Sequence, residues 1–132
     1  MKITRVLTKN QTDVDAAFRL MVFNILAHNR DDHVKNFSFM LNERNEWRLT
    51  PAYDLTFTHG PGGEHTMTVA GEGRAPDRSH IMRVADGTGI TKNRANETIG
   101  EVSSALSDWL RFADEAGVRN DTANNIKESL LD

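Results

Sequence analysis

The sequence contains no cysteine and has no excess of basic residues. Without cysteine, disulfide bonds and thiolate metal sites are excluded. Lys and Arg number 16 against 19 Asp and Glu, which gives a net charge of −3. Proteins that bind nucleic acid directly need clustered Lys and Arg to neutralise phosphates, so we expect no direct nucleic-acid partner.

Long apolar runs are also missing. The first 13 residues, MKITRVLTKNQTD, hold no apolar segment of signal-peptide length. The longest strongly apolar stretch, residues 20–27, is interrupted by Asn24 and is far too short to cross a bilayer. These absences predict a cytoplasmic protein without a membrane partner, and a length of 132 residues predicts a single domain.

The first predicted element is a helix over residues 14–28, with Asp13 as its N-cap. Its apolar residues recur at the spacing of one buried helical face. They are Val14, Ala17, Phe18, Met21, Val22, Ile25 and Leu26. The polar run H-N-R-D-D-H over residues 28–33 follows directly. The end of this buried helix is therefore expected to position a cluster of polar side chains.

The hydrophobic pattern then changes to that of short strands. Residues 37–41 and 47–50 flank the polar turn 42–46, which predicts an antiparallel β-hairpin ended by Pro51. Residues 66–70 predict one more short strand.

The remainder of the chain is predicted to be helical. Asp77 caps a helix to residue 85, a longer helix covers residues 93–116 before Gly117, and Asp121 opens the last one. The expected fold class is therefore mainly α (α+β), with one small antiparallel hairpin.

One constellation of residues carries recognisable chemistry. Kinases need a carboxylate to accept the proton of the substrate hydroxyl, and oxygen ligands for Mg²⁺. The kinase catalytic loop has an Asp followed, after four residues, by an Asn, and Asp31 and Asn36 have this spacing, with Arg30 before them. Asp54 lies just beyond the hairpin, where kinases place their second metal ligand.

Other interpretations of the same residues remain open. Asp31 and Asp32 are compatible with an ordinary polar turn at a helix end. His28, Asp31, Asp32 and His33 could instead ligate a metal in a phosphohydrolase. A single histidine more often has a hydrogen-bonded structural role, and His59 and His65, around a glycine-rich loop, are expected at the surface.

Longer strings resemble a known family. FNILAHNRDDHVKNFSFML and WRLTPAYDLT resemble the signature of the HipA-like kinases, the toxins of bacterial toxin–antitoxin pairs, and GEHTMTVAGEG resembles the segment that follows in them. The resemblance implies the helical C-terminal lobe of a Ser/Thr kinase that uses ATP and magnesium. It makes Asp31 the catalytic base and Asn36 and Asp54 the magnesium ligands, and it gives His33 and Lys35 a role in stabilising transition-state charge.

The same resemblance implies what the chain would lack. Members of the family are much longer, and the lobe that grips the nucleotide precedes the part that this sequence resembles. The G-x-G segments at Gly71 and Gly87 have no third glycine, and no P-loop occurs. We therefore expect a truncated kinase lobe, with the N-lobe absent and little activity alone.

The partners that the resemblance implies are a HipB-like DNA-binding antitoxin, the missing kinase lobe, and a translation protein as substrate. Self-association is a further expectation, through apolar surface near Phe18, Leu20 and Phe23. The alternative function is a non-catalytic kinase remnant that acts as an interaction module.

Overall fold

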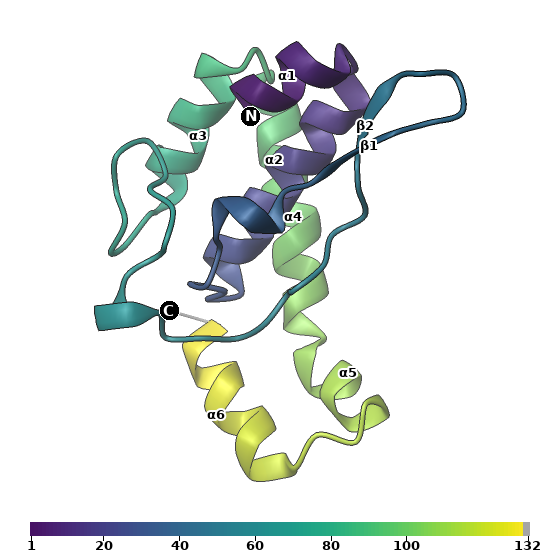
Figure 1. The fold of residues 1–132 in the computed structure, drawn as a ribbon. Coiled ribbons are helices and arrows are strands. Elements are labelled where there is room, and N and C mark those ends of the chain that lie inside the picture. The colour runs from purple at the N-terminus through teal and green to yellow at the C-terminus, as the bar shows by residue number, and fades with distance from the viewer. Residues whose placement is uncertain (131–132) are drawn as a thin grey trace.

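The computed structural model describes residues 1–130, which form six helices and a two-stranded antiparallel sheet (Figure 1). The expected mainly α fold with one hairpin is confirmed. The helices are α1 (Lys2–Thr8), α2 (Gln11–Leu26), α3 (Arg78–Gly87), α4 (Lys92–Ser107), α5 (Trp109–Glu115) and α6 (Asn120–Leu130), and the strands are β1 (Phe39–Leu41) and β2 (Trp47–Leu49).

The hydrophobic core forms where α2, α3 and α4 meet. Val14, Phe18 and Val22 of α2 are at most 1% exposed, and they belong to one cluster with Ile81 of α3 and Ile99 of α4. Burying side chains of this size contributes roughly 1.5–3 kcal/mol each. The apolar stripe expected on α2 is therefore the face that holds the three helices together.

The N-terminal end of α2 differs from the sequence prediction. Asn10, not Asp13, is the N-cap, and its side-chain oxygen accepts a hydrogen bond from the Thr12 N–H at 2.8 Å. The helix therefore begins three residues earlier than expected. The preceding helix α1 was not predicted, since its seven residues are too few to show a clear periodicity; it packs against α2 and the hairpin.

The hairpin forms as predicted. Phe39 pairs with Leu49 and Leu41 with Trp47 across the two strands. Asn42 closes the turn, because its side-chain oxygen accepts the Arg44 and Glu46 N–H groups at 2.9 Å. The antiparallel hairpin therefore returns the chain at residue 50 to the neighbourhood of residue 38, where the hairpin begins.

Two predictions of secondary structure are wrong. Residues 66–70 form no strand: Val69 only pairs with Glu72 across a tight turn. The helix expected over residues 93–116 is broken at Asp108 into α4 and α5. The break lets α5 fold against α6, where the Trp109 indole N–H donates to the Ala123 carbonyl at 2.8 Å.

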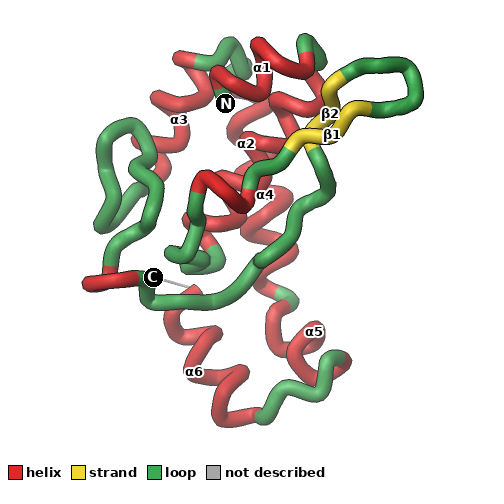
Figure 2. The backbone as a smooth tube through the Cα atoms, viewed as in Figure 1, coloured by secondary structure: helices red, strands yellow, loops and turns green. Residues whose placement is uncertain are grey.

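A long irregular segment joins β2 to α3. Figure 2 shows it running across the front of the helices before it turns up to α3. It includes a short 3₁₀ turn at Pro61–Gly63, and it brings residues far along the sequence back to the end of α2.

Candidate active site

The end of α2 fixes the direction of the loop that follows it. His28 has a left-handed backbone, with φ 51°, which turns the chain out of the helix. The next residue, Asn29, is 1% exposed, and its amide nitrogen donates to the Asn24 side-chain oxygen at 3.1 Å. The Thr58 N–H donates to the His28 carbonyl at 3.1 Å, so the irregular segment pairs with the loop here.

Asp31 lies in this loop with its side chain 47% exposed. One of its carboxylate oxygens is 2.7 Å from Nε2 of His33. The Asn36 amide nitrogen donates to the Asp31 carbonyl at 3.1 Å, across the 3₁₀ turn Val34–Asn36. The structure therefore brings Asp31 into contact with both His33 and Asn36.

The segment that carries Asp54 is tied to this region by Tyr53, the residue before it. The Tyr53 hydroxyl donates its proton to the Lys35 carbonyl. The Ser38 hydroxyl also contacts the Tyr53 hydroxyl oxygen, and since the Tyr53 proton is already used, Ser38 is the donor in that hydrogen bond. Tyr53 thus joins the segment after the hairpin to the residues on either side of Asn36. Asp54 itself is exposed, has φ 55°, and makes no hydrogen bond or ion pair with any other residue of the described chain.

Lys35 is also exposed. Its ammonium group forms no ion pair within residues 1–130, so nothing in that part of the chain neutralises its charge. The residue before Asn36 thus carries a cation without an ion pair in residues 1–130.

Asp32 is in the opposite environment, which the sequence did not reveal. It is 5% exposed; one oxygen accepts the Met67 N–H at 3.1 Å, and the other is 3.2 Å from Nδ1 of His65. His65 is 8% exposed, so its expected place at the surface is wrong, whereas His59 is exposed as expected. Two adjacent aspartates look alike in a sequence, and only the fold separates them.

The glycine-rich turn after Thr58 is held against the same loop. The Arg30 guanidinium donates to the Gly63 carbonyl at 2.7 Å. Gly60 has φ 69°, and a Cβ there would collide with the Glu64 carbonyl and with Cβ of Arg30. Glycine is therefore required where the turn passes Arg30.

The structure does not support the phosphohydrolase interpretation. No three His, Cys, Asp or Glu side chains in the described part of the chain could hold a metal ion together. Asp31 and His33 lie 2.7 Å apart, but Asp32 points away from them into its buried pair with His65.

The sequence that forms this fold and loop matches one known family. The chain matches the HipA-like C-terminal domain over residues 1–129, and it belongs to that family. It is also similar to the putative kinase Y4mE of Sinorhizobium fredii (strain NBRC 101917 / NGR234), with 30% identity over 116 residues. That match covers 88% of this chain and 22% of the relative, so the chain spans about a fifth of the relative's length. None of the described helices is long and apolar enough to cross a membrane.

Proposed function

We propose that this chain supplies the catalytic base and the magnesium ligands of a Ser/Thr protein kinase that transfers a phosphoryl group from ATP. The observation that carries the proposal is the arrangement around Asn36. Its side chain is bonded to the backbone of Asp31, and the residue before it is bonded to Tyr53, the neighbour of Asp54. Asp31 and Asn36 are thus bonded directly, and the segment that carries Asp54 is bonded to the residue before Asn36, which supports a shared role for the three groups that kinases need.

The residues present fit a magnesium ion. The amide nitrogen of Asn36 faces the Asp31 carbonyl, so its amide oxygen is directed away and accepts no hydrogen bond from residues 1–130. The Asp54 carboxylate is exposed and unpaired in the same part of the chain. Amide and carboxylate oxygens are the donors that Mg²⁺ prefers, and a bound ion would neutralise charge on the transferred phosphoryl group.

Asp31 is the residue suited to accept the proton of the substrate hydroxyl. Its side chain is open to solvent on one side, while His33 holds one of its two oxygens. The other oxygen remains for the hydroxyl. The unpaired ammonium of Lys35 and the ring of His33 would stabilise negative charge that develops beside it.

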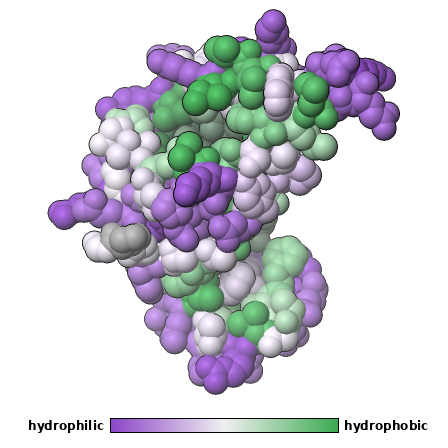
Figure 3. Space-filling model, in the orientation of Figure 1, coloured by the Kyte–Doolittle hydropathy of each residue, from purple (hydrophilic) through white to green (hydrophobic). Residues whose placement is uncertain are grey.

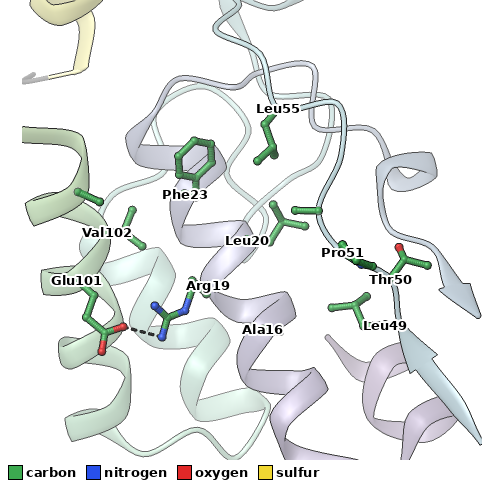
Figure 4. Close-up of a pocket in the computed structure, with 12 residues that line it drawn as sticks. Ala16, Arg19, Leu20, Phe23, Leu49, Thr50, Pro51, Leu55, Glu101 and Val102 are labelled. Atoms are coloured by element: carbon green, nitrogen blue, oxygen red, sulfur yellow. Dashed lines mark ion pairs between the residues drawn. The ribbon is translucent and has the colours of Figure 1, made fainter. Parts of the chain in front are cut away.

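Grooves on the surface support a partner for this chain. One groove has a volume of about 440 Å³. Figure 4 shows Leu20, Phe23 and Leu55 pointing into it, with the Arg19–Glu101 ion pair at its side. A second groove of about 520 Å³ shares Phe23 and Leu55 and continues toward α6. Partners that would cover them are a nucleotide-gripping lobe, an antitoxin of the HipB-like kind or a second copy.

The expected apolar surface is only partly where the sequence put it. Phe18 is 1% exposed, so it belongs to the core and not to a docking face. Leu20 and Phe23 do line the groove. Further apolar surface is made by Ile3 and Val34, which are 68% and 65% exposed. Figure 3 shows hydrophobic residues gathered on the upper half of the face turned toward the viewer. These surfaces favour, as a second candidate function, a non-catalytic interaction module.

Titration of the purified chain with Mg-ATP, followed by a radiolabel transfer assay, tests the proposal. We expect weak ATP binding that requires Mg²⁺ and falls about tenfold or more in Asp54→Asn. The slow transfer expected of the chain alone should fall at least about 100-fold in Asp31→Asn. Asp114→Asn, an exposed change on α5, is the matched control. Binding and transfer that persist unchanged in both site variants would contradict the kinase proposal and leave the interaction module.

A further inference from the structure

The buried pair of Asp32 and His65 has no part in the proposed chemistry, although it adjoins Asp31. Both side chains are almost excluded from solvent, at 7% and 3% exposure. Both oxygens of Asp32 are occupied, by the Met67 N–H and by the His65 ring. A buried carboxylate without such partners would be strongly destabilising, so the two segments are bound to one another here.

The same two segments are joined on the other side of Asp31. The Arg30 carbonyl accepts hydrogen bonds from the Thr66 N–H at 3.0 Å and from the Thr66 hydroxyl at 3.1 Å. The His65 N–H in turn donates to the Gly73 carbonyl at 2.7 Å, which keeps His65 in place. Residues 65–67 therefore hold the backbone both before and after Asp31.

The side chain of Asp31 lacks comparable support of its own. Its one side-chain partner, His33, is itself 51% exposed, and an exposed contact of this kind holds a carboxylate weakly. The position of Asp31 is thus set by its backbone. The Asp31 carbonyl also accepts the Asn36 amide, so a backbone shift at Asp31 would move a proposed magnesium ligand as well.

We propose that Asp32 and His65 are positioning residues, which lock the loop backbone so that Asp31 and Asn36 face the reacting groups together. This role rests on the function proposed above for Asp31 and Asn36. Displacements of about 1 Å in such groups can cost roughly 100-fold in rate, so a buried anchor one residue away has a large effect without touching substrate.

The pair has a spectroscopic signature that a general loss of stability does not produce. Asp32 is acceptor-only when ionised, so Nδ1 of His65 carries the proton in the wild-type chain. In Asp32→Asn the amide oxygen must face the Met67 N–H, which leaves the amide nitrogen facing Nδ1. Nδ1 must then accept, and the proton moves to Nε2. Nitrogen-15 NMR of the His65 ring at pH 8 distinguishes the two tautomers.

Two substitutions at His65 separate the hydrogen bond from the bulk of the ring. His65→Asn keeps an N–H donor near the place of Nδ1, whereas His65→Leu keeps only the bulk. For His65→Leu we expect amide exchange at Met67 to rise about tenfold or more. We also expect the binding of Mn²⁺-ATP, followed by paramagnetic broadening of the Asn36 amide, to weaken severalfold. His65→Asn should recover most of both, and His59→Asn, in the same turn but exposed, should change neither.

The outcomes separate this inference from the proposed function. If His65 keeps its tautomer in Asp32→Asn, or if His65→Leu leaves Met67 exchange and Mn²⁺-ATP binding at wild-type values, the positioning role is wrong, whatever Asp31→Asn does. If instead the tautomer and exchange change as expected while the wild-type chain shows no broadening at Asn36, the anchor is real and the metal-site proposal fails. Should His65→Leu not fold, the Asp32→Asn tautomer and the recovery in His65→Asn still decide the matter.

Discussion

Aspartate side chains in two regions of this molecule differ in burial and in hydrogen bonding. In the packed region, Asp13 and Asp32 are each 5% exposed, and both oxygens of each side chain are occupied. On the surface beside the hairpin, Asp31 is half exposed with one contact, and Asp54 is exposed with none among residues 1–130.

The difference shows what burial and bonding say about role. A carboxylate taken out of water must be fully hydrogen-bonded, so Asp13 and Asp32 have no capacity left for a ligand. Asp31 and Asp54 keep oxygen lone pairs open to solvent, and Lys35, which precedes the partly exposed Asn36, is exposed as well. The contrast separates structural carboxylates from candidate functional ones, and it can be tested on the single scale of unfolding free energy.

The largest expected effect is at Asp13. Arg48 donates to it twice, from Nε at 2.8 Å and from a terminal nitrogen at 3.0 Å, which joins β2 to α2. Hydrogen bonds to a charged, buried acceptor contribute about 1.5–3 kcal/mol, so Asp13→Ala should lower the free energy of unfolding by that amount. Urea unfolding followed by circular dichroism measures it.

The matched control is an exposed ion pair of similar length. Arg19 and Glu101 lie 2.6 Å apart but are 45% and 46% exposed. Exposed pairs contribute about 0–1 kcal/mol, so Glu101→Ala should cost less than Asp13→Ala. Equal losses in the two variants would contradict the role given to burial.

Asp13 also gives the packed region a dependence on pH. The Arg48 guanidinium bonded to it, more than any other neighbour, holds the pKa of the Asp13 carboxyl below its usual range. A depressed folded-state pKa adds stability that is complete above the unfolded pKa, about 3.9, and is lost as the pH falls through the folded value. Between pH 5 and pH 2 the wild-type chain should therefore lose more stability than Asp13→Asn, in which this carboxyl is absent. Parallel stability curves for the two proteins would be the opposite result.

Much of the fold could be predicted from local patterns in the sequence. The apolar face of α2, the Asp77 cap and the hairpin between β1 and β2 depend on neighbours within a few residues, so periodicity and turn residues indicate them. The errors arose where distant contacts decide. Asp13 looked like a cap because its partner, Arg48, lies 35 residues away.

The candidate site shows the same limit. Spacing alone could select Asp31 and Asn36, because they share one short loop and a direct hydrogen bond. The environment of Asp32 could not be predicted, since its partners His65 and Met67 come from the irregular segment beyond the hairpin. A second acidic residue beside a candidate base, with a histidine in a later loop, is the weak signal that could have pointed to it.

A smaller effect is expected at Asp77, which is exposed but not free. Its carboxylate accepts the Ser79 and His80 N–H groups at the start of α3, and the Ser79 hydroxyl and the His80 ring, both bonded to it, hold its pKa well below the usual range. Asp77→Ala should speed amide exchange in the first turn of α3 severalfold, with a smaller loss of global stability than Asp13→Ala. Asp86→Ala, at the other end of the same helix, is the control. Equal amide exchange in the two variants would show that the hydrogen bonds of an aspartate do not mark it as structural.

The smallest effect on unfolding is expected at Asp54, and here the small size is the point. The side chain has no partner within residues 1–130, so removing its charge costs no contact in that part of the chain. Its φ of 55° lies in the left-handed region, which Asn tolerates as well as Asp, so Asp54→Asn adds no backbone strain. We therefore expect a change in unfolding free energy within about 0.5 kcal/mol. The same substitution keeps an amide oxygen but removes the charge of the one carboxylate among the two proposed ligands, so Mn²⁺-ATP binding should fall about tenfold or more, since hard cations depend on carboxylate charge. A carboxylate whose removal leaves stability unchanged but weakens metal binding has a role in binding the ligand and not in holding the fold. If Asp54→Asn instead lowers stability and leaves Mn²⁺-ATP binding intact, Asp54 belongs with Asp13 and Asp32, and the surface beside the hairpin is not a metal site.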